Sequence, residues 1–413
     1  MCLWRLWEKT LSKLILTKIE TNEFAGRVAA LQEDGRIVEL RLAPLEDNSI
    51  LGNMYIGKVE NIAANIGAAF VQIAPGQRCY LPLKEAEHAV FAPERKKGSP
   101  LRPGDELLVQ VNRAAMKGKL PSVTTNLNFT GKYLVLTSGN KTVGFSSKLN
   151  MEDKKRLTTW LSSDLEDENR GYGLIVRTNA AEAEKEELLR EFTFLKEEFF
   201  RVMRDSQTRT CYSILYRTEG VCLEAVRDVY SRGLEEIVTD DLTLYEDVRE
   251  WLLHISPGET DKLCLYQDKL LPLYKLYRLE TALGEVLQER VWLKSGGFLV
   301  IQQTEAFVSI DVNSGKYTGK KKAEETYRKI NLEAAGEISR QLRLRNLSGI
   351  ILIDFINMEN PDHTDELFHV LQKYLRHDPV KARAIDITPL HILEMTRKKV
   401  RRPVREELLE IRK

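Results

Sequence analysis

Residues 298–321 read FLVIQQTEAFVSIDVNSGKYTGKK, and residues 348–357 read SGIILIDFIN. The first stretch contains two β-rich runs separated by a polar corner, a pattern that predicts a hairpin. The second stretch is a continuous apolar run, which is typical of a strand buried on both faces. Between them the apolar residues follow helical spacing. Strand, helix and strand with this connection favour a parallel pair joined by a right-handed crossover.

Each of these two strands ends in a carboxylate, Asp311 in the first and Asp354 in the second. Parallel strands bring their carboxyl ends to one edge of a sheet, where open α/β folds usually bind ligands. Adjacent strands lie roughly 4.8 Å apart, so both carboxylates can reach one ion. We therefore predict a Mg²⁺ site that a substrate phosphate completes, because Mg²⁺ typically takes one or two carboxylates plus phosphate. Asn313, on the same side of the chain as Asp311, can orient an aspartate or a water. A turn or helix-cap role is the alternative for each aspartate.

Three stretches carry a family resemblance, namely TEAFVSIDVNSGKYTGKK (304–321), NLEAAGEISRQLRLRNLSGIILIDFINM (331–358) and ILEMTRKK (392–399). They resemble the catalytic part of the ribonuclease E/ribonuclease G family, and a weaker resemblance covers most of the chain. It implies a DNase I-like subdomain in which Asp311 and Asp354 bind one Mg²⁺ beside Asn313. The implied activity is an endoribonuclease that cuts single-stranded RNA in RNA processing, including rRNA processing, and decay. Its products would carry 5′-phosphate and 3′-hydroxyl ends.

The chain has 413 residues, which is long enough for more than one domain. Pattern and resemblance together predict an α/β multi-subdomain fold. It consists of an RNase H-like scaffold with an inserted OB-fold RNA-binding domain and a 5′-sensor, followed by a DNase I-like catalytic subdomain. The predicted boundaries are 1–52 and 211–288 for the two parts of the RNase H-like subdomain, 53–126 for the OB-fold, 127–210 for the 5′-sensor and 289–413 for the catalytic subdomain.

The two predicted parts of the scaffold have different local patterns. Residues 15–31 and 35–43 read as two paired strands joined by a hairpin at Asp34-Gly35. Residues 211–288 alternate strands with helices and so predict a small α/β sheet, whose first strand lies in YSILYR (212–217). Asp240 and Asp241 follow one of these strands, and a turn or helix-cap role is the better interpretation for them.

Residues 53–126 read as a small β module, because short strands are punctuated by glycine and Pro-Gly. Five short strands that close a barrel and present aromatic and lysine side chains can hold a single nucleic-acid strand. The resemblance implies that Phe70 and Tyr80 stack on bases and that Lys119 contacts RNA. Core packing is the alternative for either aromatic ring.

The segment GLIVRT (173–178) resembles the family's sensor for a 5′-monophosphate. The guanidinium of Arg177 would bind two phosphate oxygens, and the hydroxyl of Thr178 would complete the site. An arginine at a strand end is otherwise most often a solvated surface charge. Ser147-Lys148 stands where the family often has two basic residues, so one auxiliary positive charge is absent. The helix that follows carries an apolar stripe expected in the core, formed by Leu188, Phe192, Leu195, Phe199 and Met203.

The net charge is only +1, so any nucleic-acid binding must come from local basic clusters. One cluster follows Asp311 and consists of Lys316 and residues 320–322; the other is residues 397–402. Both are predicted to meet RNA phosphates, and a solvated charged face is the alternative.

Cysteine usage and hydropathy indicate the compartment. The five cysteines are odd in number and lack a C-x-x-C pair, which favours a reduced cytoplasm over a disulfide framework. No apolar run approaches the length of a membrane span, so none is expected.

The chain departs from the family pattern at three places. Asn357 replaces a usual aspartate, and His391 replaces a typical glycine. The sequence ends at Lys413, about where the family has paired cysteines that share zinc between subunits, so we expect no zinc link. A homo-oligomer formed through other surfaces and a monomer both remain open. Two other functions also remain open, a non-catalytic RNA-binding protein of the same architecture and a DNA-cleaving nuclease.

Overall fold

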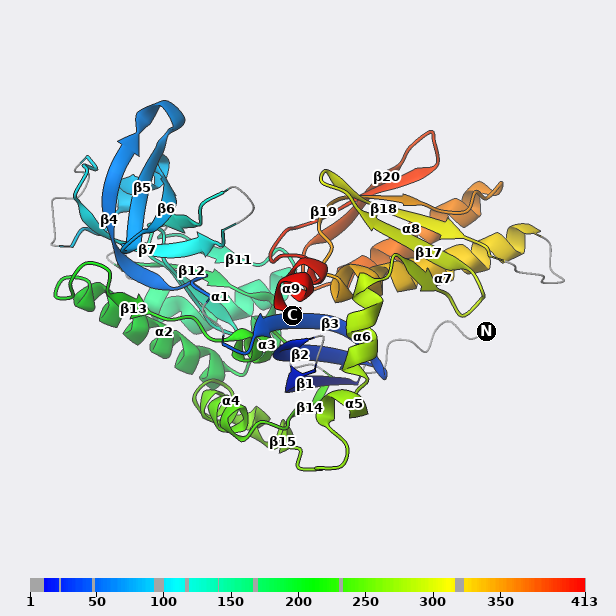
Figure 1. The fold of residues 1–413 in the computed structure, drawn as a ribbon, viewed down its shortest axis with the longest axis horizontal. Helices are drawn as coiled ribbons and strands as arrows, with labels where there is room; N and C mark the ends of the chain where they lie inside the picture. The colour runs from blue at the N-terminus through cyan, green and yellow to red at the C-terminus, as the bar shows by residue number, and fades with distance from the viewer. Residues whose placement is uncertain are drawn as a thin grey trace. The chain divides into compact units, whose positions relative to one another are not determined.

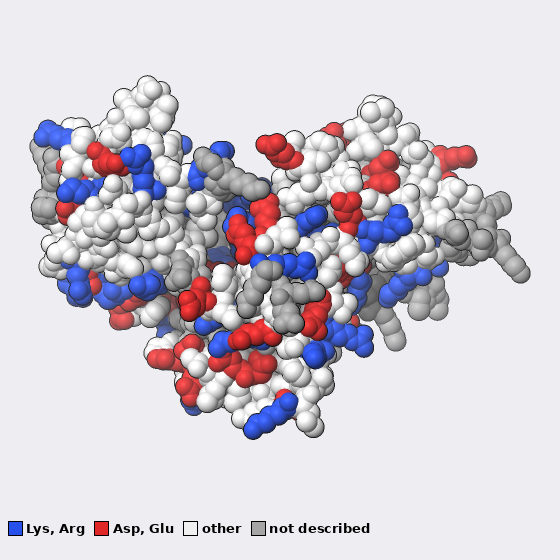
Figure 2. Space-filling model, viewed as in Figure 1, with Lys and Arg blue, Asp and Glu red and all other residues white. Residues whose placement is uncertain are grey.

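A computed structural model describes residues 11–21, 24–46, 49–92, 100–115, 119–139, 141–165, 170–229, 233–315 and 323–412. The chain forms two compact units. The first unit comprises Met1–Glu46, Gly233–Tyr245 and Lys262–Lys413, and the second comprises Asp47–Arg232 and Glu246–Asp261. Figure 1 labels most of the helices and strands of both units. Acidic and basic side chains are interspersed over the face drawn in Figure 2, which agrees with the small net charge.

The first unit contains a five-stranded sheet in the order β15-β14-β1-β2-β3. Its strands are β1 (Ser12–Glu20), β2 (Ala25–Glu33), β3 (Arg36–Pro44), β14 (Leu234–Thr239) and β15 (Leu263–Leu265). Asp34 and Gly35 both have positive φ, 47° and 77°, as the tightest type I′ hairpins require, so the predicted Asp-Gly turn is confirmed. The prediction of one strand over residues 15–31 was wrong, because a turn after Glu20 divides it into β1 and β2.

Helices pack on this sheet around a common apolar core. They are α5 (Leu273–Leu276), α6 (Leu279–Leu287) and α9 (Val404–Ile411). Helix α4 (Leu242–Ile255) begins just after β14. Its first turn is capped by Asp241, whose carboxylate accepts hydrogen bonds from the backbone N–H groups of Thr243 and Leu244 at 3.0 and 3.3 Å. The predicted cap role of Asp241 is therefore confirmed.

The second sheet of this unit has six strands in the order β16-β17-β18-β19-β21-β20. They are β16 (Arg290–Trp292), β17 (Phe298–Gln303), β18 (Phe307–Asn313), β19 (Gly349–Asp354), β20 (Ala382–Ile387) and β21 (Ile392–Arg397). Helices α7 (Ala323–Leu344) and α8 (Pro361–Arg376) bury their apolar faces on one side of it (Figure 1). The β17–β18 hairpin and the parallel β18–α7–β19 crossover confirm the pattern predicted from the sequence.

The second unit contains a small closed barrel. Its five strands are β4 (Met54–Ala63), β5 (Ala68–Ala74), β6 (Gln77–Pro82), β7 (Glu106–Arg113) and β8 (Ser122–Thr124). The pairing of β4 with β7 closes the ring, as predicted. Short 3-10 helices η1 (Ala64–Ile66) and η2 (Leu83–His88) join the strands. Strand β13 (Ile214–Tyr216) was expected in the α/β sheet, but it pairs with β4 instead. Local alternation predicts a strand and cannot choose its distant partner.

A four-stranded sheet in the order β11-β12-β10-β9 completes the second unit. Its strands are β9 (Asn128–Thr130), β10 (Leu134–Thr137), β11 (Val143–Phe145) and β12 (Gly173–Val176), and the surrounding helices are α1 (Met151–Leu165), η3 (Thr178–Glu182), α2 (Lys185–Asp205), α3 (Val221–Asp228) and η4 (Pro257–Lys262). Four members of the predicted α2 stripe are buried, and Met203 packs partly buried against them.

The described helices and cysteines bear on the predicted absence of membrane spans and disulfides. Among the helices that the structure describes, none is long and apolar enough to cross a membrane. Cys79, Cys211, Cys222 and Cys264 are thiols rather than disulfides.

Candidate active site

The two predicted metal-binding aspartates lie side by side on the sheet of the first unit. Strands β18 and β19 pair in parallel, and their register places Asp311 directly opposite Asp354. Val308, Ile310 and Val312 alternate with these outward residues and point into the core beneath α7. Alternation along each strand therefore turns both carboxylates to the opposite, solvent-facing side, where both are exposed.

The pair places two like charges on neighbouring strands. Neither carboxylate forms an ion pair with a basic side chain in the described part of the chain. Partial burial and the charge of Asp311 raise the pKa of Asp354 above its usual value. Asn313 donates a hydrogen bond from Nδ2 to Oδ2 of Asp311 at 2.6 Å, which holds this carboxylate in one orientation.

These donors fit a hard divalent cation. Two neighbouring carboxylates repel each other, and a shared cation removes that repulsion. No cluster of three or more acidic, histidine or cysteine residues suited to a metal occurs within the residues described. Two carboxylates completed by water and a substrate phosphate is the arrangement that suits Mg²⁺ better than a closed protein cage.

Glycines allow the close backbone packing that positions Asn313. A Cβ atom added to Gly297 would lie 2.7 Å from the carbonyl oxygen of Asn313. A Cβ on Gly315 would clash with the carbonyl oxygen of Gly296, and Gly315 also has a positive φ of 62°. Only glycine satisfies both the space and the backbone angle at residue 315.

The outward face of the sheet also carries groups that the sequence analysis missed. Strand β16 was not predicted, although the alternation in RVWL and the Ser-Gly-Gly turn before β17 signal it. It places Arg290 and Trp292 beside β17, on the same face as the carboxylates.

Comparison with known proteins identifies the family of this fold and site. The model of the ribonuclease E/G family matches residues 128–400. Ribonuclease G of Salmonella typhimurium (strain SL1344) is 33% identical over 392 residues, which cover 92% of this chain and 79% of that protein. The chain belongs to the ribonuclease E/G family. Ribonuclease G of Haemophilus influenzae (strain ATCC 51907 / DSM 11121 / KW20 / Rd) is 31% identical, covering 96% of this chain and 81% of the relative. Ribonuclease E of Nostoc sp. (strain PCC 7120 / SAG 25.82 / UTEX 2576) is 32% identical, covering 90% and 54%.

In this member of the ribonuclease E/G family, Phe70 and Tyr80 meet on the surface of the barrel. Strands β5 and β6 place them directly opposite each other. Their ring centroids are 6.5 Å apart in an edge-to-face arrangement, and both rings are half-buried rather than in the core. The guanidinium of Arg78 lies 5.4 Å from the Phe70 centroid. Lys119 is exposed and precedes β8, which pairs with β6 at Tyr80. The register thus brings the two predicted stacking rings together beside a cation.

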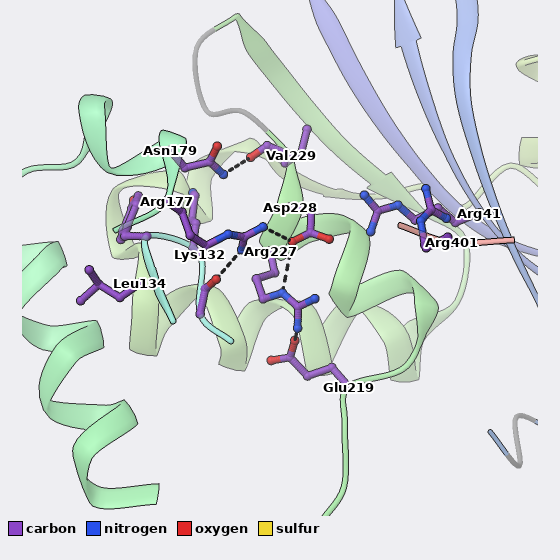
Figure 3. A network of polar contacts seen from close by, with 12 residues as sticks. Arg41, Lys132, Leu134, Arg177, Asn179, Glu219, Arg227, Asp228, Val229 and Arg401 are labelled. Carbon is purple, nitrogen blue, oxygen red and sulfur yellow. Dashed lines mark hydrogen bonds and ion pairs between the residues drawn. The ribbon is translucent and has the colours of Figure 1, made fainter. Parts of the chain in front are cut away.

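Arg177 and Thr178, the residues of the predicted 5′-sensor, already have protein partners. Figure 3 shows those of Arg177. Arg177 donates from Nη2 to the carboxylate of Asp228 at 2.7 Å and from Nη1 to the carbonyl oxygen of Gly131. Arg227 also donates to Asp228, at 3.3 Å. The hydroxyl of Thr178 lies 2.8 Å from that of Ser146. Asp228 could not be predicted as a partner from sequence pattern, and it neutralises part of the charge on Arg177.

One predicted phosphate-binding cluster needs correction. Arg397 is buried and forms an ion pair with Asp378 at 2.7 Å, so it cannot reach RNA. Arg401 pairs with Glu39 at 3.1 Å, and Arg402 pairs with Glu410 at 2.6 Å. Within this cluster only the exposed Lys398 and Lys399 still fit the prediction. The other cluster, Lys316 and residues 320–322, lies outside the described residues.

Asn357 and His391, the two substitutions noted in the sequence, both lie at exposed positions next to strands. Asn357 is exposed, three residues beyond Asp354. His391 lies in the turn between β20 and β21 with a positive φ of 62°, a conformation that favours glycine. A glycine, the residue that the resemblance leads one to expect here, would adopt this angle without strain.

Proposed function

We propose that this chain is a Mg²⁺-dependent endoribonuclease that cuts single-stranded RNA and leaves 5′-phosphate and 3′-hydroxyl ends. Membership of the ribonuclease E/G family supports the endoribonuclease class. The proposal assigns it to cytoplasmic RNA processing and decay, including rRNA. The observation that carries the chemistry is the register of Asp311 against Asp354 on the outward face of the sheet.

In this proposal Asp311 and Asp354 are the protein ligands of the cation, and the substrate phosphate supplies further oxygen. The bound cation would stabilise charge developing on the phosphoryl oxygens. Asn313 keeps one oxygen of Asp311 engaged at 2.6 Å, so the carboxylate is oriented before RNA arrives. An in-line water attack forms the new phosphorus–oxygen bond and breaks the bond to the 3′ oxygen, which leaves as the hydroxyl.

The second unit supplies the proposed grip on RNA. Phe70 and Tyr80 offer π-faces to two bases, and Lys119 contacts the backbone or a base edge. Arg177 and Thr178 recognise a 5′-monophosphate. On binding, Arg177 redirects one of its N–H donors from the carboxylate of Asp228 to a phosphate oxygen. This arrangement predicts a preference for monophosphorylated over hydroxyl 5′ ends.

The test is cleavage of a 5′-monophosphorylated, uridine-rich oligoribonucleotide in Mg²⁺ by the natural chain and by Asp354→Asn. We expect the variant to cleave about a thousandfold more slowly, because it loses several kcal/mol of charge stabilisation. RNA affinity should fall far less than the cleavage rate, because the proposed contacts of Phe70, Tyr80 and Lys119 do not depend on the cation. Glu305→Gln is the matched control, since Glu305 is an exposed carboxylate in the β17–β18 turn, away from the strand ends that carry Asp311 and Asp354.

Each other outcome identifies a different alternative. Equal activity in Asp354→Asn removes the site assignment. Tight RNA binding without cleavage by the natural chain indicates a non-catalytic RNA-binding protein. Equal cleavage of the deoxy counterpart indicates a nuclease that does not distinguish DNA from RNA.

A further inference from the structure

An aromatic pair and an arginine lie beside the carboxylates on the same sheet face. The register of β16, β17 and β18 places Trp292 opposite Phe298 and Phe298 opposite Asn313. The centroids of the Trp292 and Phe298 rings are 5.2 Å apart. The guanidinium carbon of Arg290 lies 4.4 Å from the Phe298 centroid and 5.8 Å from that of Trp292. The three side chains therefore form one continuous surface cluster, the Trp292 platform.

The Trp292 platform is not needed to fill the core. Val291, Leu293 and Leu299 alternate with its residues and supply the buried contacts of these strands. Trp292 keeps 64% of its surface exposed. A tryptophan that is this exposed gains little stability from packing, and exposed aromatic rings are the groups on which unpaired bases stack.

Arg290 is the positively charged member of the platform and lies on the same face of the sheet as the carboxylates. Arg290 lies in one cross-strand row with Val300, Asp311 and Asp354. It forms no ion pair with an acidic side chain among the residues described. Its guanidinium faces the rings and keeps donor groups for a phosphate, the combination that single-strand binding sites use.

We propose that Trp292, Phe298 and Arg290 bind the nucleotide next to the scissile phosphate, with its base stacked on the rings and its phosphate near Arg290. This inference rests on the proposed ribonuclease function and adds a substrate-binding site to it. From strand spacing, the Cα atoms of Phe298 and Trp292 lie roughly 8 and 12 Å from that of Asp311. That separation suits a nucleotide adjacent to a phosphate bound at the carboxylates. Because stacking accepts any base, the site tolerates all four.

The experiment combines protein variants with RNAs that lack one base. RNA binding is measured by fluorescence anisotropy with the full-length chain carrying Asp354→Asn, which keeps the RNA intact. A short oligoribonucleotide is compared with versions that are abasic at each position in turn. The same series is measured after adding Trp292→Ala, Trp292→Phe or Phe307→Ala. Phe307 is the control, because it is an aromatic residue, 37% exposed, at the opposite end of β18.

We expect Trp292→Ala to weaken binding of the intact RNA about tenfold, with Trp292→Phe retaining most of the affinity and Phe307→Ala unchanged. Removing the base at one position of the RNA should weaken its binding to the Asp354→Asn chain about tenfold. With Trp292→Ala added, removing that base should not weaken binding further. Such non-additivity is the signature of a direct contact. Unchanged affinity of Trp292→Ala, or the same abasic penalties at every position with and without Trp292, would overturn the proposal.

Failure of this inference is distinguishable from failure of the proposed function. Cleavage by the natural chain together with additive abasic penalties refutes the platform and leaves the ribonuclease. Coupled abasic penalties without any cleavage refute the ribonuclease and leave the platform. Arg290→Gln provides a second variant, which should reduce the salt dependence of RNA binding by one phosphate contact. An unchanged salt dependence would remove Arg290 from the site.

Discussion

Two pairs of charged residues differ in sign. Asp311 and Asp354 on β18 and β19 carry like charges, whereas Arg177 and Asp228 carry opposite charges. Asp311 and Asp354 place like charges on neighbouring strands, with no basic partner in the described part of the chain. Arg177 instead has an acidic partner, Asp228, at 2.7 Å. An uncompensated carboxylate pair gains from an external cation, whereas a compensated arginine must share its charge with any incoming phosphate. The first arrangement favours metal binding, and the second favours a weak, adjustable contact.

The largest expected effect tests whether the two aspartates act as one site. Asp311→Asn and Asp354→Asn should each lower the cleavage rate about a thousandfold, because either change removes a ligand from the same cation. The double variant should be about as slow as either single variant, since the second change then removes nothing more. Single-turnover cleavage of RNA measures all three. Effects that multiply in the double variant would show that the carboxylates act independently.

A smaller effect is expected at the compensated pair. Arg177→Gln should reduce the preference for 5′-monophosphorylated over 5′-hydroxyl RNA about tenfold, because one charge-assisted contact is lost. The ratio of the two cleavage rates is the measurement, and a general folding defect cancels in that ratio. Arg177→Lys tests whether two parallel donors of the guanidinium are needed, since it keeps the charge and loses the planar geometry. If the ratio is unchanged in Arg177→Gln, phosphate sensing does not use this residue.

Glu39 extends the comparison to a carboxylate that is only partly exposed and is surrounded by arginines. Burial alone would raise its pKa, but Arg41, Arg401 and Arg343 outweigh this and lower the pKa to about 2. In the unfolded chain a glutamate titrates near 4.5. As the pH falls from 4.5 to 2, the unfolded chain takes up a proton and the folded chain does not, so stability is lost. The ionised group contributes about 3 kcal/mol above that window.

Denaturant unfolding of Glu39→Gln measures this contribution. The variant should lose about 3 kcal/mol of unfolding free energy at pH 7. The difference from the natural chain should shrink toward zero as the pH approaches 2. Glu305→Gln, at an exposed turn, should match the natural chain throughout. A difference that stays constant with pH would mean that Glu39 acts through packing rather than charge.

The smallest expected effect concerns backbone strain near the carboxylates. His391 has a φ of 62° in the turn that leads into β21, the strand paired with β19. His391→Gly should raise the unfolding free energy by about 0.5–1 kcal/mol, because relief of the left-handed strain exceeds the added flexibility of the unfolded chain. The cleavage rate should stay the same, because the substitution leaves the charges of Asp311 and Asp354 in place. A slower variant would show that this strain serves the site.

The carboxylate site was predictable because its signals are local. Asp311 and Asp354 close two apolar runs, and the helix between them fixes a parallel crossover. Pairings between distant segments were not predictable in the same way. Strand β13 joins the barrel through β4, and Arg177 meets Asp228, which lies 51 residues further along the chain. Arg397 read as a surface charge because the motif does not show its buried partner, Asp378.

If Asp311 and Asp354 share one divalent cation, replacing either aspartate should release it. Electron paramagnetic resonance counts bound Mn²⁺ on the full-length chain, in the presence of an RNA whose scissile 3′ oxygen is replaced by methylene. We expect one Mn²⁺ for each natural chain, lost in both Asp311→Asn and Asp354→Asn and retained in Glu305→Gln. Retention of that Mn²⁺ after either aspartate is replaced would contradict the shared site.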